Sequence, residues 1–161
     1  MIRAATVADA AAVALIWNHY IRASAITFNA TEKSLDEVGC TITTRLAQRC
    51  FVVAEEAGRV CGFATYDQFR SGIGYAHAME HTIQLAPDAG GLGLGRALMA
   101  AVEAHATRAG AHVMIAAVTG ENAGGRVFHS KMGYTEVGVM PQVGRKFGRW
   151  MDLVLMQKIL S

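Results

Sequence analysis

Residues 80–106 read EHTIQLAPDAGGLGLGRALMAAVEAHA, and this stretch decides how the chain folds. A short apolar segment ends at the turn signal Pro87-Asp88, glycines follow at 90, 91, 93 and 95, and Arg96 to Arg108 carries apolar residues at helical spacing. Glycines let the backbone approach a ligand closely. The helix start behind them offers unpaired N–H groups and the positive end of a dipole. The pattern predicts a strand, a phosphate-binding turn and a helix; the alternative is a glycine-rich connector without a ligand.

The spacing of these glycines separates the known phosphate motifs. The dinucleotide fingerprint needs a third small residue where this chain has Arg96, and it belongs to the first strand–turn–helix unit rather than to mid-chain. The nucleotide-triphosphate loop needs lysine and a hydroxyl after its last glycine, whereas Gly95 is followed by Arg96-Ala97. The segment G-L-G-L-G-R-A-L therefore matches neither of these two phosphate-binding motifs.

Length and composition indicate one domain over residues 1–161 with a sizeable core. A net charge of +2 favours neither a nucleic-acid partner nor a membrane surface. We expect no signal peptide and no spanning helix, because no apolar run approaches the ~20 residues that a bilayer requires. The three cysteines are odd in number and lack metal-ligand spacing, which predicts a reduced, cytoplasmic protein. The low charged content, 17%, indicates weakly that the chain forms an oligomer.

Periodicity and turn residues predict an alternation of strands and helices along the whole chain. Capping-box patterns at Thr6–Asp9 and Ser34–Glu37 open the first two helices, and Asp67 to Ala76 is expected to be a loop. The expected strands are 2–5, 51–56, 59–66, 80–86, 112–118, 134–140 and 150–159, and the expected helices are 10–20, 34–48, 96–108 and 122–132. This order predicts an α/β fold with a mixed sheet and a parallel strand pair around the third helix.

Residues 77–81 spell H-x-x-E-H, a pattern of zinc peptidases. That motif requires a helix, where positions i and i+4 share a face. The residues around it favour extended backbone, in which His77 and His81 would lie roughly 13 Å apart. This is too far to share one zinc ion, so we expect no metal site.

The glycine segment resembles the acyl-CoA loop of the GNAT acetyltransferase superfamily, [QR]-x-x-G-x-[GA] before a helix. Gly93 and Gly95 match its glycines, and Gly90 stands in place of the basic or amide residue. Residues 122–134, NAGGRVFHSKMGY, resemble the second signature of the superfamily, N-x-x-[AS]-x-x-[LF]-[YH]-x-x-x-G-[FY]. The resemblance implies the GNAT fold, a central mixed sheet with helices on both faces, in which two central strands splay apart to admit the pantetheine arm.

Three further segments resemble phosphinothricin and methionine sulfoximine acetyltransferases. They are Met79-Glu80-His81-Thr82, Thr27-Phe28 and the tail over residues 138–153, GVMPQVGRKFGRWMDL. The implied reaction is acetylation, from acetyl-CoA, of the α-amine of a small amino-acid analogue, in a protein that is usually a homodimer. By the same resemblance acetyl-CoA is bound by Ile83, Gln84, Leu85, Gly90, Gly91, Leu92, Gly93, Leu94, Gly95, Arg96 and Asn122. The acceptor is bound by Phe28, Arg70, Ser71, Gly72, Glu80, His81 and Thr82.

Acetyl transfer requires that the amine lose a proton and that the leaving thiolate can gain one. Glu80 begins the strand that leads to the loop, and it is the candidate base; the alternative is a solvated edge glutamate. His129 stands where many relatives have tyrosine, and it is the candidate acid or else a packing residue. Arg145, Lys146 and Arg149 are expected on a solvated loop. A different amine acceptor, or an acyl-CoA sensor without turnover, remains an alternative function.

Overall fold

The computed structural model describes all residues, 1–161, and its elements follow one another in the predicted order. Seven strands form one mixed sheet, in the spatial order β1-β2-β3-β4-β5-β7-β6. The strands are β1 Ile2–Ala4, β2 Phe51–Glu56, β3 Arg59–Gln68, β4 Ala78–Leu85, β5 Val113–Thr119, β6 Thr135–Lys146 and β7 Arg149–Ile159. The helices are α1 Ala10–Ala23, α2 Leu35–Gln48, α3 Leu94–Arg108 and α4 Ala123–Lys131, with 3₁₀ turns at Val7–Asp9 and Ile73–Tyr75.

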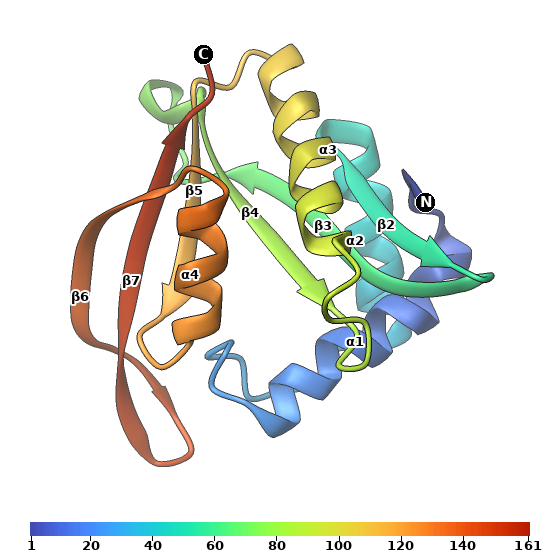
Figure 1. Cartoon of the computed structure of the whole chain (residues 1–161), viewed down its shortest axis with the longest axis horizontal. Helices are drawn as coiled ribbons and strands as arrows, with labels where there is room; N and C mark the ends of the chain where they lie inside the picture. Colours follow the sequence, from blue (N-terminus) through green and yellow to red (C-terminus); the bar gives the residue numbers. More distant parts are fainter.

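The helices cover both faces of the sheet, as predicted (Figure 1). On one face α1 and α2 bury residues such as Val13 and Ile42 against Phe63 of β3. On the other face α3 buries a stripe at the predicted helical spacing, including Leu98 and Val102, and α4 packs beside it. Two apolar cores therefore hold the sheet between them. No helix is long and apolar enough to cross a membrane.

The two central strands, β4 and β5, separate halfway along their length. They pair in parallel from Ala78↔Val113 to Glu80↔Ile115 and no further, although β4 continues to Leu85 and β5 to Thr119. Beyond Glu80 each strand keeps only its outer neighbour, β3 for β4 and β7 for β5. The expected splay is confirmed, and it leaves one edge of β4 without a strand partner from His81 onward.

The tail departs from the prediction. The expected strand 134–140 runs on to Lys146, because Pro141 lies on an edge strand that pairs only with β7, where a missing N–H is tolerated. The ladder shifts between Met140 and Gly144, which absorbs the proline. The prediction of a solvated loop was wrong for all three basic residues, because Arg145 and Lys146 lie in β6 and Arg149 begins β7. Arg145 and Arg149 are exposed, whereas Lys146 is buried.

Candidate active site

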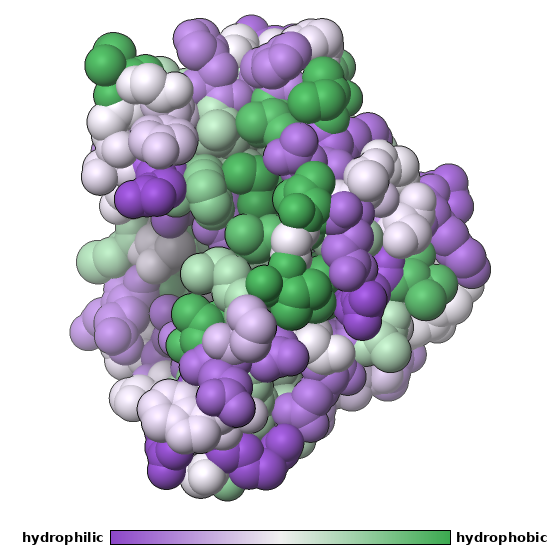
Figure 2. All heavy atoms as spheres, turned by 90° about the vertical axis from the view of Figure 1, so that its left-hand side faces the viewer, coloured by the Kyte–Doolittle hydropathy of each residue, from purple (hydrophilic) through white to green (hydrophobic).

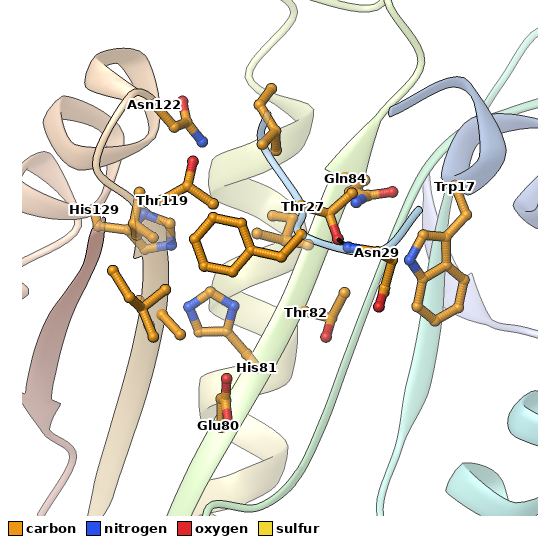
Figure 3. A pocket seen from close by; sticks show the side chains of 17 residues that line it. Trp17, Thr27, Asn29, Glu80, His81, Thr82, Gln84, Thr119, Asn122 and His129 are labelled. Carbon is orange, nitrogen blue, oxygen red and sulfur yellow. Dashed lines mark hydrogen bonds between the residues drawn. The ribbon is translucent and has the colours of Figure 1, made fainter. Parts of the chain in front are cut away.

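A cavity of about 240 Å³ lies where β4 and β5 separate (Figure 3). Its walls come from α1, the α1–α2 connection, β4, β5, the start of α4 and β7. Eight of the residues singled out in the sequence line it together: Phe28, Glu80, His81, Thr82, Ile83, Gln84, Asn122 and His129. The splay thus gathers residues that are up to about one hundred positions apart in the chain.

Two imidazole rings stack at the centre of this cavity (Figure 3). The rings of His81 and His129 have centroids 5.0 Å apart and planes 19° apart. Tyr134 packs edge-on against both, at 5.8 and 5.3 Å. Its hydroxyl donates instead to the buried Glu103, 3.0 Å away, whose carboxylate also binds Lys158. The Tyr134 ring, whose hydroxyl is held by Glu103, therefore packs at nearly a right angle against both imidazole rings and fixes their positions.

Both imidazoles are neutral near pH 7. Burial, with His129 close by, lowers the pKa of His81 to about 3. Burial also lowers the pKa of His129, although the Gly125 carbonyl opposes the shift. That carbonyl lies 2.7 Å from Nδ1 of His129 and can only accept, so Nδ1 carries the proton. Nε2 of His129 therefore holds a lone pair that faces the cavity region as an acceptor.

Polar atoms in this cavity lack the partners that buried groups normally have. Five buried side-chain atoms here make no hydrogen bond: Nδ1 and Nε2 of His81, Oε1 of Gln84, Oγ1 of Thr119 and Nε2 of His129. Elsewhere in the chain the same is true only of Nε of Arg49. Unpartnered buried groups are rare in native proteins and concentrate where a ligand completes them. Their gathering in one cavity indicates a binding site with several polar contacts.

Glu80 lies at the point where the strands separate. It is the last residue of β4 paired to β5, and its carboxylate makes no hydrogen bond within the chain. Burial raises its pKa. A carboxylate with a raised pKa and free oxygens is a stronger base than an exposed glutamate, and Glu80 lines the same cavity as the two imidazoles (Figure 3).

The glycine loop forms a second hollow, of about 250 Å³, at the end of β4. Of the predicted loop residues Leu85, Gly91, Gly93, Leu94, Gly95 and Arg96 line it, together with Phe128 of α4. Gly91 and Gly93 have φ of 81° and 74°, a conformation that favours glycine. Gly93 is the N-cap of α3, so the first N–H groups of that helix have no acceptor within it. Gly90 and Leu92 are exposed and line neither hollow.

Asn122 connects the central cavity to the start of α4. Its Oδ1 accepts from the Gly125 N–H at 2.8 Å, which leaves the amide nitrogen as a donor. A Cβ at position 125 would collide with this side chain. Alanine or serine, which the superfamily signature has at this position, would therefore require the Asn122 side chain to shift from the position it takes here.

The structure does not bring every predicted acceptor residue to the cavity. Arg70, Ser71 and Gly72 are exposed beyond the end of β3 and do not line it. The Arg70 guanidinium lies 5.5 Å from the ring centre of Tyr75. Sequence reasoning also missed two wall residues, Asn29 and Thr119, since a polar residue in a connection or at a strand end has no distinguishing pattern.

The H-x-x-E-H segment is extended from Ala78 onward, where β4 begins, and only His77 lies before the strand, in a turn. His77 instead has its Nδ1 2.7 Å from the Gly110 carbonyl, away from His81. No group of three or more His, Cys, Asp or Glu side chains is arranged to hold a metal ion.

Comparison with known proteins gives consistent matches over the whole chain. The model of the acetyltransferase (GNAT) domain family matches residues 2–155. The L-amino acid N-acyltransferase MnaT of Escherichia coli is 39% identical over 97% of this chain and 91% of its own length. The L-methionine sulfoximine/L-methionine sulfone acetyltransferase of Salmonella typhimurium is 38% identical over 97% and 92%. A phosphinothricin acetyltransferase structure from Sinorhizobium meliloti, in complex with acetyl-CoA, superposes with a TM-score of 0.94 at 31% identity, covering 100% of this chain and 88% of that one.

Proposed function

Because the chain belongs to the GNAT acetyltransferase family, we propose that it transfers the acetyl group of acetyl-CoA to the α-amine of a small amino-acid analogue. The acceptor is of the methionine sulfoximine, methionine sulfone or phosphinothricin type, for which its relatives are named. One observation carries the proposal: the unpartnered polar atoms line the same cavity as Glu80, which is partly buried and makes no ion pair.

The chain offers a continuous path for a thioester with a long pantetheine arm. Acetyl-CoA supplies the activated acetyl group and leaves as the free thiol. The open edge of β4 from His81 to Leu85 presents backbone donors and acceptors to the arm, and the α3 start with Gly91 and Gly93 suits the pyrophosphate. Between the β4 edge and the α3 start, Asn122 offers its free amide nitrogen as a further donor.

Glu80 acts as the general base for the acceptor amine in this proposal. An α-ammonium group must lose a proton before its nitrogen can attack, and a carboxylate whose pKa is raised holds that proton more strongly. The partly buried, unpaired carboxylate also attracts a cationic acceptor into the cavity, since no salt bridge neutralises it.

His129 acts as a proton relay rather than as a ready acid. Its Nε2 carries a lone pair because Nδ1 donates to Gly125, so this atom must receive a proton before it can give one to the departing thiolate. The amine supplies that proton, and the low pKa favours its prompt release. The ammonium thus loses two protons: Glu80 takes the first before attack and releases it to solvent, and the second leaves the nitrogen after the C–N bond has formed and passes through Nε2 of His129 to the thiolate as the C–S bond breaks.

Thiol release from acetyl-CoA tests the proposal, with methionine sulfoximine, methionine sulfone, phosphinothricin and a polyamine panel as acceptors. Glu80→Gln should lower kcat by about 10²- to 10⁴-fold and leave the affinity for acetyl-CoA unchanged. Glu56→Gln, at an exposed glutamate on the β2–β3 hairpin, is the matched control. Release with polyamines alone would reject the acceptor class. Tight acetyl-CoA binding without turnover of any acceptor would favour a sensor.

We also propose that two copies associate through the β6 side of the sheet, in the cytoplasm. Figure 2 shows hydrophobic residues gathered on the side of the molecule where β6 and β7 lie. Val137, Val139 and Val143 of edge strand β6 and Trp150 of β7 are each about half exposed. Sedimentation should report a dimer that Val139→Asp converts to a monomer, and a monomeric wild type would contradict the proposal.

The three free cysteines agree with the proposed reducing compartment.

A further inference from the structure

Lys146 is a buried lysine without an acidic partner. Its side chain is 4% exposed as part of β6, and no carboxylate lies within ion-pair distance of it. Its Nζ donates instead to two backbone carbonyls, that of Ser24 at 2.7 Å and that of Thr27 at 2.9 Å. Burial lowers the pKa of this ammonium. An isolated buried charge is costly for stability, and replacing it by an apolar side chain of similar volume is often neutral or stabilising.

The two carbonyls belong to the segment that forms one wall of the cavity. Residues 24–29 leave the end of α1, and Thr27, Phe28 and Asn29 line the same cavity as His81 and Glu80 (Figure 3). Within the segment the backbone is held only by weak local contacts, such as Asn29 N–H to Thr27 Oγ1 at 3.2 Å. The Lys146 ammonium ties this wall to the sheet by hydrogen bonds, across more than one hundred residues of sequence.

A second contact from β6 acts on the same segment. Gly144 lies two residues before Lys146 on the same face of the strand, and the Phe28 ring packs directly on it. A Cβ at Gly144 would fall inside the van der Waals surface of that ring. Any side chain at 144 therefore has to displace Phe28 from its place in the cavity wall.

We propose that Lys146 is a positioning residue for the acceptor site: from β6 it holds the wall 24–29 in place, and Gly144 leaves the room in which Phe28 sits. The inference rests on the proposed acetyl transfer and deepens it. The proposed donor site is built by β4, the glycine loop and α4, and both hydrogen bonds of Lys146 go to the wall segment instead. Loss of the clamp should therefore weaken acceptor binding selectively.

The first experiment compares the steady-state kinetics of the wild-type chain with those of Lys146→Met, which keeps an unbranched side chain one atom shorter and removes the donors. Arg108→Met, at an exposed basic residue at the end of α3, is the control. The KM for the acceptor should rise roughly ten- to a hundredfold in Lys146→Met, because three wall side chains must be ordered on binding. The KM for acetyl-CoA and the thermal midpoint should stay near those of Arg108→Met. Equal changes in both KM values, accompanied by a lowered thermal midpoint, would show a purely structural lysine and overturn the proposal.

A double-mutant cycle tests the part played by Gly144. Gly144→Ala should raise the acceptor KM in the wild-type background and change it little in a Phe28→Ala background, because the displaced ring is then absent. Equal effects of Gly144→Ala in both backgrounds would contradict the role assigned to this glycine.

Amide hydrogen exchange separates this proposal from the reaction itself, since it needs no acceptor. Exchange in residues 24–29 should be faster in Lys146→Met than in wild type and in Arg108→Met, with the rest of the chain unchanged. Unchanged exchange in this segment would overturn the clamp even if the enzyme is active. Faster exchange in a protein that turns over none of the acceptors would support the clamp and reject the proposed function.

Discussion

The pKa of His81 makes a quantitative prediction about how stability depends on pH. In the unfolded chain this imidazole titrates near its ordinary value of 6.5, and in the folded protein near 3. Between these values the unfolded state binds one proton more than the folded state, so the free energy of unfolding falls as pH is lowered. The full difference is roughly 5 kcal/mol over the whole interval, at about 1.4 kcal/mol for each pH unit.

The effect is already measurable at pH 5, about 1.5 units below the pKa of the unfolded chain. There His81 should cost the folded state about 2 kcal/mol relative to pH 7.5. His81→Phe removes this titration while keeping a ring that can stack on His129. Carboxylates such as Asp9, whose pKa is lowered to about 2 by Arg3, remain ionised in this window in the folded protein.

Urea unfolding at pH 5.0 and 7.5 is the assay, on wild type, His81→Phe and the control His112→Gln, which removes an exposed imidazole. Wild type and the control should lose about 2 kcal/mol more than His81→Phe when the pH is lowered. His129, whose pKa is also lowered, remains in all three proteins and cancels in the comparison. Parallel losses in wild type and His81→Phe would refute a neutral, desolvated His81.

Three further predictions concern the helices that frame the site. Gly93→Ala should raise the KM for acetyl-CoA and leave the KM for the acceptor unchanged, because alanine is strained at a φ of 74° in the loop. The same acetyl-CoA KM in the variant and in wild type would contradict this prediction. Leu98→Ala, at a fully buried position of α3, should lower the free energy of unfolding by about 2 to 5 kcal/mol in urea. Ser34→Ala should cost about 1 kcal/mol in the same assay, because it removes the cap that accepts from the Glu37 N–H.

The parts of the fold that could be predicted are those whose cause is local. The stripe of α3, the cap at Ser34 and the glycines before Leu94 each follow from residues within a few positions of one another. The splay of β4 and β5 came from the family resemblance rather than from periodicity, and the register of the two strands confirms it.

The parts that could not be predicted depend on partners that are distant in sequence. Lys146 has the appearance of a loop cation beside Arg145, and only the packing of β6 against residues 24–27 shows that it is buried. Pro141 suggested the end of a strand because nothing in the sequence says that this strand is an edge. The stacking of His81 on His129 likewise joins β4 to α4, and it sets the two pKa values that a motif alone cannot supply.

The separation of β4 and β5 has three consequences that belong together. It removes the strand partner from one edge of β4, and it lets α4 bring His129 over His81. It also leaves Glu80 partly buried at the last paired position without a partner for its carboxylate. Desolvation raises the pKa of the carboxylate and lowers those of the imidazoles, so that the site holds a carboxylate of raised pKa and two uncharged imidazoles. A cationic amine that enters such a site meets groups able to take its proton and no cation that repels it, which is the electrostatic requirement for acetylating an amine near neutral pH.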